Sequence, residues 1–171
     1  HSRFLWRATE LLRVNPQARE AAALLYKNTD ATSHRRALIA DLLAQAGGPE
    51  AQSTLVDVLN STATQSDPAR LELWQRLGFV AAPSEATVHA AKLHYSEVQG
   101  DERLSMIHTL GAIAGQARQG ENPAMADTIH SILQEGYSAA STEAERVSAL
   151  AGLGNARKVS DLPVFMAALS S

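Results

Sequence analysis

A leucine closely followed by a glycine recurs along this chain as part of a repeated unit. The repeated leucines stand at intervals of 34, 33 and 43 residues: Leu43, Leu77, Leu110 and Leu153. Internal repeats of roughly 20–50 residues are typical of supersecondary units that stack, because a single unit cannot bury its own apolar face. The repeat therefore predicts an extended stack of small units, and it favours a binding or supporting surface over a catalytic cleft.

Prolines in this sequence mark the starts of helices rather than their interiors. Asn15-Pro16 and Asn122-Pro123, for example, place a capping side chain before a proline, whose missing amide is harmless in a first turn. Between such marks the apolar residues recur at helical spacing, and no alternating strand pattern is present. The sequence therefore predicts ten helices, at about 3–13, 16–28, 32–46, 49–61, 67–80, 83–98, 101–118, 122–138, 142–154 and 160–169.

We expect these helices to form an all-α fold, an α-solenoid in which antiparallel helix pairs stack into a superhelix. Residues 1–171 are interpreted as a single repeat domain, with a divergent or partial N-terminal unit at 1–30 and about four helix pairs at 31–171. Alanines at repeated positions, such as Ala112 and Ala149, favour close approach of the helices. An irregular bundle of ten short helices is the alternative arrangement.

The ends of the sequence suggest a fragment of a longer chain. It begins at His1 rather than at methionine and enters a helical pattern almost at once. We therefore expect the first and last helices to expose apolar faces, with Phe4 and Trp6 turned toward a missing neighbour.

Composition limits the classes of function that remain. The formal net charge of −3 gives no basic surplus, whereas nucleic-acid binding depends on neutralising phosphates. There is no cysteine, which excludes disulfides, thiolate zinc sites and cysteine nucleophiles. The longest apolar stretches fall far short of the ~20 residues that span a bilayer. Hydrophobic residues make up 45% and charged residues 19%, which is ordinary for a globular chain and argues against disorder.

The residue pattern predicts no catalytic residue, no metal site and no cofactor. His89 and His94 are five positions apart, about 140° around a helix, whereas helical metal pairs stand four apart on one face. His108 and His130 lie in paired helices of one unit and are the remaining histidine pair. Carboxylates such as Asp101 and Glu145 cluster at helix starts, where they stabilise the helix dipole, so they need no catalytic explanation. Residues 142–145, Thr-Glu-Ala-Glu, are predicted to form a capping box.

Four stretches resemble a known family: residues 42–51, 79–84, 105–113 and 149–156. Their leucine-rich helix ends and Gly-Pro-Glu-Ala and Ala-Leu-x-x-Leu-Gly-Asn-Ala steps are similar to HEAT-type repeats. More narrowly, they resemble the helical domain of the large lipid transfer proteins, the vitellogenin and apolipoprotein B class. The chain departs from that class in lacking a cysteine in the third unit's loop and any β-rich region. The resemblance implies a domain that braces a lipid cavity, not a lipid pocket.

Four residues are candidates for contact with a partner: Lys92, Tyr95, His130 and Tyr137. Aromatic side chains dominate binding hot spots, and both tyrosines fall near the ends of second helices. In HEAT-like stacks the second helices line the concave binding face, and Lys92 and His130 join the set on that positional ground. Trp74 stands one turn before a repeated leucine and is predicted to lie in the core.

We therefore expect a non-enzymatic scaffold or protein-interaction domain of a larger protein. The resemblance implies that it braces a lipid-carrier assembly by contacting a neighbouring domain of the same chain, with lipid bound only through the parent protein. The same resemblance favours an extracytoplasmic or secreted location. A general HEAT-repeat adaptor without lipid is one alternative. A helical-repeat nucleic-acid enzyme is the other, and the charge argues against it.

Overall fold

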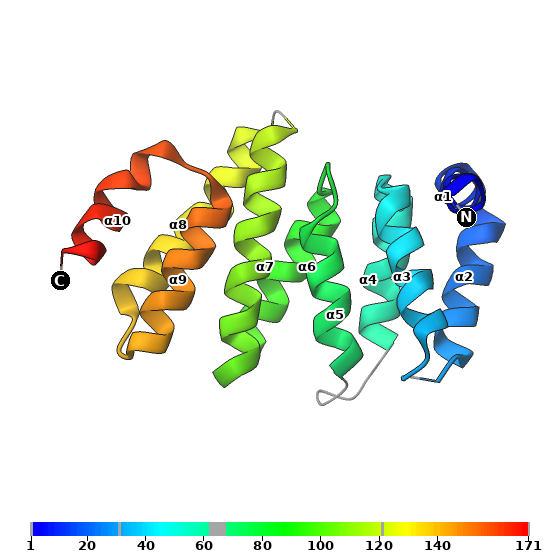
Figure 1. The fold of residues 1–171 in the computed structure, drawn as a ribbon, viewed down its shortest axis with the longest axis horizontal. Helices are drawn as coiled ribbons and strands as arrows, with labels where there is room; N and C mark the ends of the chain where they lie inside the picture. The colour runs from blue at the N-terminus through cyan, green and yellow to red at the C-terminus, as the bar shows by residue number, and fades with distance from the viewer. Residues whose placement is uncertain (1, 31, 62–67, 121, 171) are drawn as a thin grey trace. The chain divides into compact units, whose positions relative to one another are not determined.

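The computed structural model describes residues 2–30, 32–61, 68–120 and 122–170, and these residues form helices joined by short turns (Figure 1). Within them there are ten α-helices, one short 3-10 turn and no strand, which confirms the all-α prediction. The helices are α1 (Ser2–Val14), α2 (Pro16–Asn28), α3 (His34–Ala46), α4 (Pro49–Ser61), α5 (Pro68–Gly78), α6 (Glu85–Glu97), α7 (Gly100–Gln119), α8 (Pro123–Ala139), α9 (Glu143–Ala156) and α10 (Leu162–Leu169), with η1 (Val159–Asp161) before the last.

Helix boundaries follow the capping signals in the sequence. Asn15 caps α2 by accepting a hydrogen bond from the Ala18 amide at 3.1 Å, and Pro16 occupies the first helical position. Asn122 caps α8 in the same way. These caps satisfy amides that have no partner inside the helix, which is why the predicted helix starts agree with the observed ones within about two residues.

The chain divides into two compact units, His1–Ala90 and Ala91–Ser171, and α6 runs from one into the other. In the first unit α1 packs on α3 and α3 on α5, while α2 packs on α4. In the second unit α7 packs on both α8 and α9. The four repeated leucines, Leu43, Leu77, Leu110 and Leu153, are all buried in the cores of their units. Trp74 is also buried, as predicted.

A buried glutamine forms the polar centre of the first unit. Gln52 in α4 is 0% exposed, and its amide nitrogen donates to the carbonyls of Gly47 and Ala82 at 2.7 and 2.8 Å. Its amide oxygen accepts from the Ser84 amide at 2.8 Å and the Thr87 hydroxyl at 2.9 Å. All four hydrogen-bonding positions of the side-chain amide are thus used, and they join the end of α3 to the start of α6.

Glycines allow the closest helix approach in the second unit. A Cβ atom placed on Gly111 of α7 would lie 2.2 Å from the carbonyl oxygen of Gly152 in α9, and one on Gly115 would lie 2.2 Å from that of Asn155. Neither backbone could remain where it is with a larger residue. The sequence predicted close approach through alanines, whereas the tightest contacts fall on this pair of glycines one turn apart.

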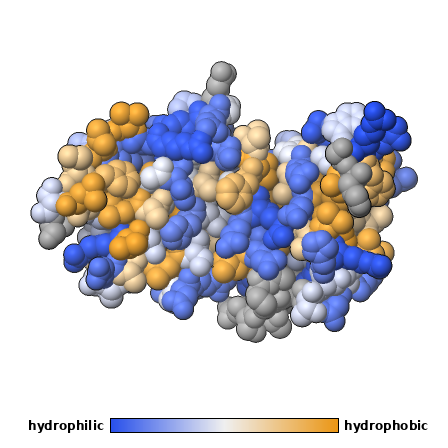
Figure 2. Space-filling view, in the orientation of Figure 1, coloured by the Kyte–Doolittle hydropathy of each residue, from blue (hydrophilic) through white to orange (hydrophobic). Residues whose placement is uncertain are grey.

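Apolar side chains are exposed on the first and last helices. Phe4 and Trp6 of α1 are 71% and 66% exposed, and no residue of the apolar helix α10 is buried. Figure 2 shows the apolar surface of α10. No helix of the described residues has the combination of length and apolarity that crossing a bilayer requires.

Candidate functional site

A groove of about 540 Å³ lies in the second unit, where the end of α6 meets the starts of α7 and α9 and the end of α8. Pockets of roughly 300–1,000 Å³ are the size that holds small ligands or side chains. We call it the Tyr95 groove. Its lining residues are Tyr95, Gln99, Gly100, Asp101, Arg103, Leu104, Ile107, Gly136, Ala139, Ala140, Thr142 and Glu145.

Tyr95 and Arg103 form one wall of the groove. The Arg103 guanidinium lies 4.2 Å from the centre of the Tyr95 ring and donates a 3.2 Å hydrogen bond to the Tyr95 carbonyl. A guanidinium over an aromatic face is attracted by the ring quadrupole, so the two interactions hold the arginine in one place. Tyr95 is only 8% exposed. The two contacts fix the position of Arg103, and its positive charge remains in the groove lining.

Glu145 supplies a carboxylate at the start of α9. Its Oε2 atom accepts hydrogen bonds from the amides of Ser141 and Thr142 at 2.8 and 3.0 Å, while its own amide donates to the Thr142 hydroxyl. This reciprocal arrangement is a capping box, as the sequence predicted for residues 142–145. The hydrogen bonds from the Ser141 and Thr142 amides keep the pKa of Glu145 below its ordinary value, so this carboxylate is ionised at neutral pH.

Asp101 supplies a second carboxylate, in the first turn of α7. Its side chain forms no ion pair with any residue that the structure describes. The neighbouring Glu102 differs, because its carboxylate lies 2.9 Å from the His94 ring nitrogen. Position explains both acidic residues structurally, since negative charge near a helix N-terminus is stabilising. Asp101 nevertheless leaves an uncompensated charge at the mouth of the groove.

A smaller cavity of about 320 Å³ in the first unit has a related design. There the Arg36 guanidinium lies 4.4 Å from the centre of the Tyr26 ring, and both residues line the cavity. In each unit, therefore, a tyrosine near the end of one helix is covered by an arginine from the start of the next. This recurrence was missed in the sequence, because the two tyrosine–arginine spacings differ by two residues.

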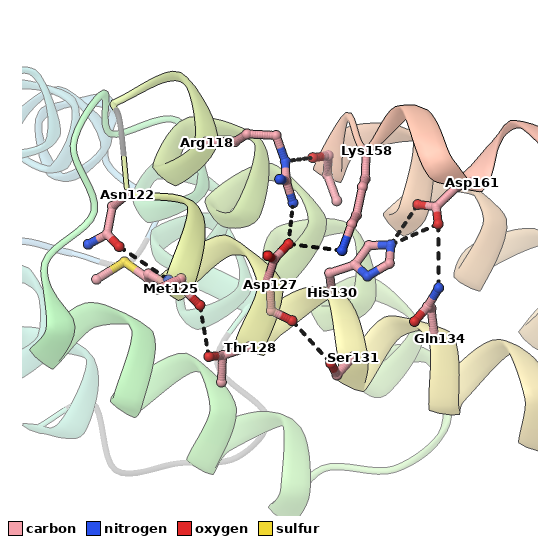
Figure 3. A network of polar contacts seen from close by, with 12 residues as sticks. Arg118, Asn122, Met125, Asp127, Thr128, His130, Ser131, Gln134, Lys158 and Asp161 are labelled. Carbon is pink, nitrogen blue, oxygen red and sulfur yellow. Dashed lines mark hydrogen bonds and ion pairs between the residues drawn. The ribbon is translucent and has the colours of Figure 1, made fainter.

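His130, one of the predicted contact residues, lies in the interior of the second unit. Its ring nitrogen is 2.7 Å from a carboxylate oxygen of Asp161, and the two side chains are 2% and 1% exposed (Figure 3). Gln134 makes a longer contact of 3.5 Å with the same carboxylate. The pair links α8 to the turn that precedes α10. Its burial gives it a structural role and leaves no room for a substrate.

An exposed polar cluster lies one turn before His130 on α8 (Figure 3). Asp127 of α8 accepts hydrogen bonds from Lys158 at 3.0 Å and from Arg118 at 3.1 Å. The hydrogen bond from Lys158, followed by that from Arg118, lowers the pKa of Asp127 below its ordinary value. Arg118 also donates to the carbonyl of Ala156 at 3.3 Å, so this one side chain connects the ends of α7 and α9 with α8.

The four predicted contact residues thus fall in three environments. Tyr95 lines the groove, His130 is buried, and Lys92 and Tyr137 are half-exposed outside the groove lining. Asp101 and Glu145 were recognised as helix-start carboxylates, but their shared groove depends on contacts between distant helices. His108 is exposed on α7, and within the described ranges no three metal-ligating side chains gather.

Comparisons of this chain with protein-family models, curated proteins and solved structures yield no match.

Proposed function

We propose that this chain is a non-enzymatic scaffold that presents a surface to a protein partner. In this proposal its helices form an α-solenoid of HEAT-like antiparallel pairs, the arrangement that the leucine repeat favours. The second helices of the pairs carry the contact surface, which includes the half-exposed Lys92 and Tyr137. A role in bracing a lipid-carrier assembly is a narrower form of the proposal, and it depends on the family resemblance alone.

The observation that carries the proposal is a polar joint that recurs in both units. In the first unit, Arg13 in the last turn of α1 donates from Nε to the carbonyl of Ala46, the last residue of α3, at 3.1 Å. In the second unit, Arg118 in the last turn of α7 makes the same bond to Ala156, the last residue of α9. The final carbonyls of a helix lack partners within it, so each arginine satisfies one.

The arginine bond joins α1 to α3 and α7 to α9, so each bond skips one helix. In a solenoid of helix pairs the first helices of successive pairs pack together in this way, which supports a stack of repeated helix pairs. Three features recur in both units: the arginine at a helix end, the arginine-covered tyrosine and the buried leucine. Joints that recur between successive helix pairs are typical of repeat proteins, in which each pair needs a neighbour and partners bind over extended surfaces.

Site-specific photo-crosslinking in the native host tests the proposal. A photoreactive phenylalanine analogue replaces Lys92 or Tyr137 on the second helices, and His108 on the exposed face of α7 serves as the control position. We expect one defined protein to be captured from Lys92 and Tyr137 and not from His108. Equal capture from all three positions, or no capture from the second helices, would contradict the proposal.

A further inference from the structure

The lining of the Tyr95 groove combines aliphatic side chains with two acidic groups. The aliphatic side chains are those of Leu104, Ile107, Ala139 and Ala140. Ile107 is only 6% exposed, so this part of the lining is continuous with the core of the unit. The acidic groups, Asp101 and Glu145, come from the first turns of two different helices. A ligand in this groove would therefore meet both aliphatic surface and negative charge.

The lining also holds one positive charge, on Arg103, which the two carboxylates outnumber. Arg103 is stacked on the Tyr95 ring and hydrogen-bonded to the Tyr95 carbonyl, and it forms no ion pair among the described residues. Glu145 is held by neutral donors, the amides and hydroxyl of Ser141 and Thr142. Hydrogen bonds from neutral groups keep a carboxylate ionised and leave its charge in place. The lining as a whole therefore carries a net negative charge.

We propose that the Tyr95 groove is a docking site for a basic peptide segment of a partner protein. The carboxylates of Asp101 and Glu145 contact the cationic heads of lysine or arginine side chains, and the aliphatic stems of those side chains lie along Leu104 and Ile107. Long basic side chains suit such a surface because their methylene stems are apolar while their ends are charged. The inference rests on the proposed function, since it names the chemistry of one contact site on the scaffold.

Acidic and apolar features also determine what the groove rejects. An acidic segment would bring like charge toward Asp101 and Glu145, and like-charge contacts at an interface disfavour binding. An uncharged apolar segment would contact the aliphatic lining but would leave the charges of the two carboxylates uncompensated. Discrimination between basic and acidic peptides of equal length is therefore the property that identifies the site.

The test uses the full chain and two synthetic peptides with a fluorescent label. One alternates arginine or lysine with leucine or alanine, and the other has glutamate at every basic position. Fluorescence anisotropy measures the affinity, and amide chemical shifts in ¹H–¹⁵N spectra locate the site. We expect saturable binding of the basic peptide alone, with shifts of the Gly100, Leu104 and Thr142 amides and weaker binding at high salt.

Two matched charge reversals separate the groove from general acidity. Asp101→Lys should weaken binding of the basic peptide at least tenfold, whereas Glu20→Lys, an equal charge change at an exposed position of α2, should change it less than twofold. Asp101→Asn retains nearly the same shape and should give an intermediate loss. Far-UV circular dichroism checks that each variant is folded, which is expected because both positions are on the surface.

Four results would overturn the inference: equal binding of the acidic peptide, equal loss in both charge reversals, shifts outside the groove, or displacement by spermidine at the peptide's own affinity. The last result would assign the groove to small polyamines instead. Failure of this site is distinguishable from failure of the scaffold proposal. Crosslinking from Lys92 and Tyr137 without peptide binding would remove only the groove assignment, and peptide binding without crosslinking would remove only the scaffold.

Discussion

Replacing Gln52 should destabilise the first unit more than replacing an exposed glutamine would. The side chain is fully buried and makes four hydrogen bonds, to Gly47, Ala82, Ser84 and Thr87. In Gln52→Ala all four are lost together with the packing of the side-chain stem. The Thr87 hydroxyl retains a 3.0 Å contact with the Ser84 hydroxyl, so three backbone groups lose this partner.

The size of the effect follows from the number of groups left without partners. A buried polar group without a hydrogen bond costs about 1–3 kcal/mol, and water entering the vacated space recovers part of that cost. The three groups belong to the half-exposed Gly47 and Ser84 and to the exposed Ala82, so their cost falls at the lower end of this range; together with the lost packing of the side-chain stem it gives a loss of about 3 kcal/mol in the free energy of unfolding. For a unit of this size, that loss lowers the melting temperature by roughly 12–24 °C.

Tryptophan fluorescence during urea unfolding reports on this unit selectively. Both tryptophans, Trp6 and Trp74, belong to the first unit, and only Trp74 is buried, so its emission changes when the unit unfolds. Gln45→Ala is the matched control, because Gln45 is exposed on α3. We expect that control to alter the free energy of unfolding by less than about 0.5 kcal/mol.

Gln52→Leu decides whether hydrogen bonds or packing account for the effect. Leucine refills most of the space but satisfies none of the four polar partners, so this variant should be at least as unstable as Gln52→Ala. A Gln52→Leu protein with the stability of the original chain would refute the reasoning, because it would show that the site requires only volume. Equal stability of Gln52→Ala and Gln45→Ala would refute it as well.

Two further predictions concern the second unit. Gly111→Ala should lower the free energy of unfolding by about 3 kcal/mol, because the new Cβ atom would lie 2.2 Å from the Gly152 backbone. Gly154→Ala should raise it by up to about 1 kcal/mol through helix propensity, because its Cβ atom would lie 3.7 Å from its nearest neighbour, Phe165. Melting curves followed by far-UV circular dichroism should therefore shift in opposite directions, and shifts in the same direction would contradict the prediction. Asp127→Asn should lower stability at neutral pH, because the pKa of Asp127 is lower in the folded protein than in the unfolded chain. The stabilisation by the ionised Asp127 is complete above about pH 4 and is lost as the pH falls through the folded-state pKa. The urea midpoints of the two proteins should therefore converge in acid, and a difference that stays constant with pH would contradict the assignment.

The sequence predicted the helices well because their determinants are local. Proline and asparagine at helix starts act within one turn, so Asn15-Pro16 and Asn122-Pro123 marked real boundaries. Leucine spacing predicted core positions for the same reason, since an apolar residue at a fixed point of each unit is buried wherever the unit packs. The capping box at residues 142–145 was likewise visible, because its two partners are three positions apart.

The candidate site was less predictable because it depends on contacts between distant residues. Nothing near Arg103 in the sequence indicates that it stacks on Tyr95, and the position of His130 on a second helix suggested a surface residue. Its partner Asp161 is 31 residues away and lies in a turn that the sequence did not mark. A buried contact between a histidine and a carboxylate cannot be inferred from the histidine alone, since it depends on a partner that is distant in the sequence.

The contacts that define each unit's geometry are polar, although its stability is mainly apolar. Apolar burial is non-directional, so the repeated leucines favour stacking without specifying how one helix meets the next. Hydrogen bonds depend on distance and angle, and those made by Gln52, Arg13 and Arg118 each join two or more helices. Because these side chains stand at helix ends and in turns, they set the spacing there. The Tyr95 groove lies at the other ends of α7 and α9, where a different polar contact, that of Arg103 with Tyr95, joins the start of α7 to the end of α6.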